Sequence, residues 1–188
     1  MQENGKAKDL MTGGLIAGTA ATENASATGK YVVECFDKDG NLKWVAESKN
    51  LVVNVGLQYM AGAALTGTTP VTTWYIGLYG SGATNDPAAG DTLALHGGWT
   101  EITPYAGNRV AATFAAATNA NPSVVTNSAN KAQFTINAPA TVGGAFLCSV
   151  ASGTSGVLFS AADFASPGDR AVVSGDVILV QYSFSLSA

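Results

Sequence analysis

Charged side chains are scarce in this chain, and their scarcity narrows the classes of function. Only 12% of the 188 residues are Asp, Glu, Lys or Arg, about half the usual share in a soluble globular protein. The nine Lys and Arg residues do not cluster, and the net charge is −4, so no basic stripe can follow nucleic-acid phosphates. We therefore expect no nucleic-acid partner. The surface should be polar through Ser, Thr, Asn and Gly, or covered by other protein.

Long apolar runs are also missing. No stretch approaches the ~18 apolar residues of a membrane-spanning helix, so no membrane association is expected. Near the N-terminus, two lysines precede the short segment LMTGGLIAGTAA, an order that imitates a secretory signal. Asp9 interrupts the basic region, and the segment is rich in Gly and Thr. We therefore interpret residues 1–29 as an extended N-terminal arm and residues 30–188 as one β-sandwich domain.

Cysteine is limited to Cys35 and Cys148. Two such distant cysteines make no metal-ligand pattern. Both stand in apolar, strand-like contexts, which favours two separate buried thiols over a disulfide. The sequence leaves the pairing open.

The chain has a single histidine, His96, within GDTLALHGGWTEITPY. A serine hydrolase needs a nucleophile on a strained turn, typically G-x-S-x-G, and none occurs. A zinc site would need further His or Cys ligands. We therefore predict a turn here, with Asp91 capping one helical turn, Gly97 ending it and Trp99 anchoring the core. No catalytic, cofactor-binding or metal-binding residue is assigned, and the protein is not expected to be an enzyme.

The carboxylates offer two further kinds of site. Asp37 and Asp39 lie in DKDGN, which resembles the opening of a calcium loop, but the register is wrong and the distal Glu is missing. The other candidates for a glycosidase pair stand beside Gly, Pro or Ala and suit turns or caps; they are Asp86, Asp91, Asp163, Asp169 and Asp176. The three tryptophans, Trp44, Trp74 and Trp99, could form a sugar-stacking platform, but their strand-like surroundings favour core packing.

The hydrophobic pattern is mainly that of β-strands. Residues 30–36 and 42–47 flank DKDGN and predict a hairpin, and residues 50–54 and 72–80 predict further strands. Residues 55–65 predict a short helix with one apolar face of Leu57, Met60, Ala61, Ala64 and Leu65. Beyond residue 108 the pattern is β throughout. This spacing predicts an all-β fold, an antiparallel sandwich or jelly roll with one or two short helices.

The last predicted strand, DVILVQYSFSLS, carries the clearest alternation. One face bears Ile178, Val180, Tyr182, Phe184 and Leu186. Because alternate side chains of a strand point to opposite sides, this face should be buried, and the strand should be central in its sheet.

Four stretches resemble a family of small structural proteins of tailed bacteriophages. They are KYVVECFDKDGNLKW…NLVVNVGL, WYIGLYG…GDTLALHGGWTEITPY, TINAPATVGGAFL and GDRAVVSGDVILVQYSFSL, in order over roughly residues 30–187. Other members more often carry ASHAGWTE where this chain has ALHGGWTE. These motifs are turns and core strands, so they are more typical of a fold than of an activity.

The resemblance implies a non-enzymatic virion component, made in the bacterial host cytoplasm. A capsid decoration (cement) protein is favoured, bound to the major capsid protein and to copies of itself as a homo-oligomer. A tail or tail-fibre component that binds a host receptor or glycan is the alternative.

Overall fold

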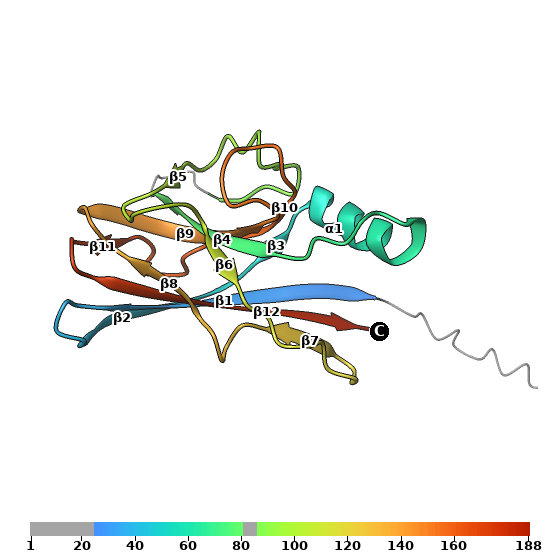
Figure 1. The fold of residues 1–188 in the computed structure, drawn as a ribbon, viewed down its shortest axis with the longest axis horizontal. Helices are drawn as coiled ribbons and strands as arrows, with labels where there is room; N and C mark the ends of the chain where they lie inside the picture. The colour runs from blue at the N-terminus through green and yellow to red at the C-terminus, as the bar shows by residue number, and fades with distance from the viewer. Residues whose placement is uncertain (1–24, 81–85) are drawn as a thin grey trace, which may run out of the picture.

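The fold consists of two antiparallel β-sheets that face each other (Figure 1). A computed structural model describes residues 25–80 and 86–188; residues 1–24 of the predicted arm lie outside them. The first sheet has the order β2–β1–β12–β7, with β8 also paired to β12, and the second has the order β3–β10–β9–β4–β5, with β11 on β9 and β6 on β4. The all-β sandwich prediction is confirmed.

The first sheet contains β1 (Ser26–Phe36), β2 (Leu42–Lys49), β7 (Ser123–Thr126), β8 (Ala132–Thr135) and β12 (Val177–Ser187). The second contains β3 (Leu51–Val52), β4 (Trp74–Gly80), β5 (Glu101–Ile102), β6 (Val110–Ala112), β9 (Ala140–Cys148), β10 (Leu158–Asp163) and β11 (Arg170–Val172). Within the described ranges, no helix is long and apolar enough to cross a bilayer.

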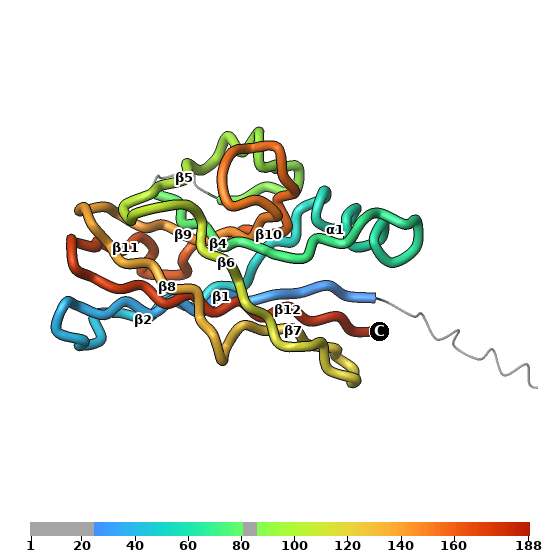
Figure 2. The backbone as a smooth tube through the Cα atoms, viewed as in Figure 1, coloured from blue at the N-terminus to red at the C-terminus, as the bar shows by residue number. Residues whose placement is uncertain are grey.

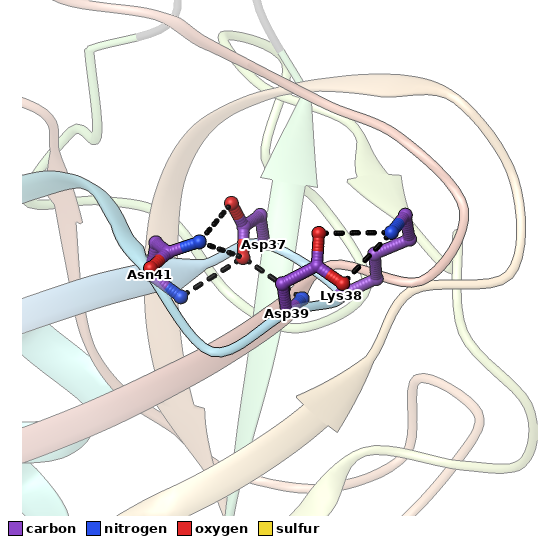
Figure 3. A network of polar contacts seen from close by, with 4 residues as sticks. All are labelled: Asp37, Lys38, Asp39 and Asn41. Atoms are coloured by element: carbon purple, nitrogen blue, oxygen red, sulfur yellow. Dashed lines mark hydrogen bonds and ion pairs between the residues drawn. The ribbon is translucent and has the colours of Figure 1, made fainter.

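The predicted hairpin is formed by β1 and β2, and a carboxylate organises its turn (Figure 3). Oδ1 of Asp37 accepts the backbone N–H groups of Asp39 and Asn41, each at 2.9 Å. The Asn41 side-chain amide donates to the same carboxylate. These hydrogen bonds lower the pKa of Asp37, and the two from Asn41 have the largest effect. Gly40 supplies the positive φ of +83° that the turn needs. Strand β1 begins at Ser26, before the expected start at residue 30.

Strand β12 is central, as predicted, with β1 on one side and β7 and β8 on the other. Ile178, Val180 and Tyr182 are fully buried, so the alternation was interpreted correctly over this part of the strand. The prediction is wrong at the end of the strand, where Phe184 is only partly buried and Leu186 is 44% exposed. The two sheets leave the interior open there, at the end of the molecule that carries the helix (Figure 1).

A chain of hydroxyl groups links the two sheets through the core. The rings of Tyr31 on β1 and Tyr182 on β12 lie 4.6 Å apart. Both hydroxyls contact the Ser160 hydroxyl of β10, at 3.0 and 3.2 Å. The Asn50 amide donates to the Tyr182 oxygen at 2.8 Å. Burial is the main cause that raises the pKa of both tyrosines, so they remain neutral donors and acceptors in an apolar interior.

A buried ion pair fixes the segment between β5 and β6, which both pair with β4. Arg109 donates through Nε and Nη2 to the two carboxylate oxygens of Glu101, at 2.8 and 2.7 Å. A third bond runs from Nη1 to the Val150 carbonyl. The guanidinium lies 5.2 Å from the centre of the Phe146 ring. The guanidinium charge is thereby paired and partly covered by an aromatic face, as burial requires.

The predicted helix is present, but its predicted face is wrong. Helix α1 (Asn54–Ala61) continues into the wider turn η1 (Gly62–Thr66). The helix packs through Gly56 and Met60, because a Cβ at Gly56 would collide with the Phe159 carbonyl of β10. Glycine at this position allows the close approach. Of the five residues expected on the buried face, only Met60 packs against the core, whereas Leu57, Ala61, Ala64 and Leu65 are exposed.

We expect Ile178→Ala to lower the free energy of unfolding by about 2–5 kcal/mol, because it opens a cavity at a fully buried site. Leu186→Ala on the same strand should cost about 0.5 kcal/mol or less, since the side chain is half exposed. Urea denaturation of both variants measures the difference. Equal losses of unfolding free energy in the two variants would contradict the difference in burial between Ile178 and Leu186.

Candidate interaction surface

The structure places His96 in a turn, against Trp99. Its Nδ1 lies 2.8 Å from the Trp99 carbonyl oxygen, and its ring stacks on the Trp99 indole with centroids 3.8 Å apart. The buried indole N–H donates to Asp91 at 2.9 Å. The turn prediction and the anchoring role of Trp99 are thus confirmed.

The predicted helical turn over residues 91–97 is wrong. Thr92 and Leu95 instead exchange two backbone hydrogen bonds. The Asp91 carboxylate accepts the Ala88 N–H and the Trp99 indole, so it is not available to cap a helix. The tertiary contact with Trp99 therefore decides the local conformation.

The two cysteines are free and buried, as predicted, in β1 and β9. Burial raises the pKa of the Cys35 thiol to about 11 and also raises that of Cys148. Few thiolates are therefore present at neutral pH, and the thiolate is the nucleophilic form. The thiols act as small apolar groups of the core.

The acidic residues lie in separate turns and strand ends of the sequence, but Asp86 and Asp169 come close enough to Asp163 to raise its pKa. Asp176 accepts the Val173 N–H at 2.9 Å and pairs with Lys43 at 2.5 Å, in the turn before β12. Asp163 lies at the end of β10 rather than in a turn. Among residues 25–80 and 86–188, no three His, Cys, Asp or Glu side chains are grouped to hold a metal ion.

Three ranges of the chain that meet at one end of the sandwich hold no charged side chain. None occurs in residues 50–80, 110–130 or 177–188. These ranges supply α1, η1, β7 and the end of β12, which lie together at one end of the molecule with the C-terminus (Figure 1; the tube in Figure 2 shows the same grouping). The β1–β2 turn, with its charged side chains, lies at the opposite end. We call the end formed by residues 50–80, 110–130 and 177–188 the uncharged end.

An apolar groove of roughly 470 Å³ opens at the uncharged end, between η1 and the edges of the two sheets. A row of aromatic rings forms its base. Trp74 makes edge contacts with Tyr59 and with Phe159, each at 5.2 Å between centroids, and Phe159 contacts Phe184 at 5.3 Å. Of the expected core tryptophans, Trp99 is fully buried, whereas Trp44 and Trp74 are partly buried against the core. Trp74 is therefore both a core residue and a groove residue.

Exposed leucines lie at the same end of the molecule, and Leu186 lines the groove. Leu65 is 84% exposed, and Leu57 and Leu186 are each 44% exposed. Leu57 and Leu65 are exposed because the helix uses its Gly56 face for packing. An uncharged surface with large exposed apolar side chains and a groove has the composition of a protein–protein contact. No motif in the sequence predicted this surface, although the charge-free run of residues 50–85 could have indicated it.

Comparisons with protein-family models, with curated proteins and with solved structures found no match to this chain. The likeness to phage structural proteins therefore rests on the four sequence stretches alone.

We expect Asp163→Asn to stabilise the protein at neutral pH. The pKa of Asp163 is raised mainly by burial of its carboxyl group, and further by the negative charges of the nearby Asp86 and Asp169. The folded state therefore disfavours the charged form of Asp163. The free energy of unfolding falls as the pH rises from 3.8, the ordinary pKa of the carboxyl, through its raised pKa in the folded protein. The melting temperature of Asp163→Asn should exceed that of the parent at pH 7, and the difference should vanish below pH 3.8.

The matched control is Asp39→Asn, which removes the same charge from the exposed hairpin turn. A gain from Asp163→Asn that persists at low pH would contradict the electrostatic explanation, as would an equal gain from the control.

Proposed function

We propose that this protein is a non-enzymatic structural component of a bacteriophage virion, a capsid decoration (cement) protein that binds the assembled head. Its partners in this proposal are the major capsid protein and further copies of itself. The observation that carries the proposal is the uncharged end, with its groove and exposed leucines.

The composition of this end supports association with protein. Charged residues are depleted at the centre of protein interfaces because their desolvation is costly, whereas aromatic residues and Met are enriched there. Tyr59, Met60, Trp74 and Phe184 provide that enrichment at the groove. The same apolar end would be a liability on a monomer that remains free in solution.

The structure around the sequence candidates also agrees with a structural role. His96, Asp37 and Asp176 each make hydrogen bonds that hold a turn. The core thiols have raised pKa values. These polar groups serve the backbone, and the exposed apolar side chains are left for recognition.

A decoration protein would act on the particle by linkage. A protein that contacts neighbouring capsid subunits across a seam binds the assembled shell and not free subunits, so it stabilises the shell. Symmetry repeats each contact many times over the head. Weak individual contacts at the uncharged end would then give a large total stabilisation.

We expect Leu65→Asp to weaken binding to undecorated phage heads by about tenfold or more, since an unpaired carboxylate buried in an interface costs several kcal/mol. Val45→Asp is the matched control, because Val45 is 47% exposed on β2, away from the uncharged end. Co-sedimentation with heads measures the affinity of each variant. Equal weakening by both variants would remove the uncharged end from the proposal.

Particles without the protein should release their DNA at a lower temperature while still adsorbing to host cells. Genome release on heating and the adsorption rate should be compared for particles with and without it. Normal heat resistance with lost adsorption would overturn the decoration proposal and favour the tail or tail-fibre alternative.

A further inference from the structure

We propose that the groove at the uncharged end is the seat of the chain's own residues 10–16, Leu-Met-Thr-Gly-Gly-Leu-Ile, which fold back onto it in the free protein. This inference concerns the isolated chain and does not depend on the proposed virion role. It joins an apolar groove that the structure describes with a short apolar segment of the sequence.

The β1–β12 pairing fixes where this segment is attached. Ser26 pairs with Ser187, and Ala27 pairs with Leu186, which lines the groove. The polypeptide that precedes β1 therefore starts from the edge of the groove itself. In Figure 1 the start of β1 and the C-terminus lie at the same end of the molecule as α1.

The length of the connection suits a fold-back. Nine residues, 17–25, separate the segment from Ser26, and ten peptide units span up to roughly 33 Å when extended. Ala27, next to Ser26, pairs with the groove residue Leu186, so the connection has length to spare for a reversal. A short covalent connection gives an effective concentration of about a millimolar. The chain's own segment therefore outcompetes the segments of other copies at micromolar protein concentration.

The chemistry of the two parts also matches. Residues 10–22 carry no charged side chain and are bounded by Asp9 and Glu23. The groove residues are likewise without charge, and aromatic rings dominate its base. Leu10, Met11, Leu15 and Ile16 provide side chains that suit such a base, and Gly13 and Gly14 allow the backbone to approach it closely. Burying these side chains requires no charged group to lose its hydration.

The test uses the full chain with two added cysteines and a short bismaleimide crosslinker. Leu15→Cys is combined with Ala64→Cys, on the groove wall in η1. The native Cys35 and Cys148 are fully buried and stay outside the reaction. The control combines Leu15→Cys with Val45→Cys. Val45 pairs with Glu34, roughly 26 Å along β1 from Ser26, which an unseated segment can also reach.

We expect the Ala64→Cys protein to give an intramolecular crosslink whose yield exceeds that of the control and does not change with protein concentration. Adding Ile16→Asp should lower this yield to the control level, whereas Thr19→Asp, with the same added charge outside the segment, should leave it unchanged. A yield no higher than the control overturns the proposal, because the segment then has no seat. Crosslinked dimers that increase with concentration also overturn it, because the groove then takes the segment of a second copy.

Discussion

The contact of Tyr31 and Tyr182 with Ser160 holds the two sheets in register, and much of the remaining structure follows from it. The tyrosines stand on the two most extensively paired strands of one sheet, and the serine stands on β10 of the other. Because all three hydroxyls are buried, each needs its partner at a fixed distance. The sheets are thereby fixed in separation near the helix, where the rings of Phe159, Trp74 and Phe184 take over the packing.

The closeness of α1 to β10 decides what the uncharged end presents to its surroundings. Gly56 lets the helix rest directly on the Phe159 carbonyl. Because the Gly56 face of α1 packs on β10, Leu57 of the helix and Leu65 of η1 point outward. The groove remains between η1 and the ends of the strands. A single small residue thus determines which apolar side chains build the core and which form an exposed surface. The exposed leucines are therefore a consequence of close packing and not of a poorly formed core.

The parts of the fold that depend on local pattern could be predicted from the sequence. The alternation of β12 and the Asp-Gly turn of the hairpin are such cases, because strand period and turn chemistry act over a few residues. The helix face could not be predicted, since the pattern of Leu57, Met60 and Leu65 does not show that a neighbouring carbonyl requires glycine. The stretch after Asp91 adopts its shape through Trp99, and β7 has no strong apolar pattern of its own. The uncharged end could not be predicted from motifs either. Its distinguishing property is the absence of charged residues from three ranges that are separated in the sequence.

The separation of charge along the molecule has a consequence for how any contact at the uncharged end should respond to its surroundings. Ionic strength acts on interactions between charges, and the three ranges that form the uncharged end, residues 50–80, 110–130 and 177–188, hold no charged side chain. Salt should therefore leave such a contact nearly unchanged, over a range in which ion pairs like Lys30–Glu47 are screened. Temperature, in contrast to salt, should change the strength of such a contact. The attraction of apolar surfaces weakens on cooling, so a contact formed through this end is firm in concentrated salt and loosens in the cold.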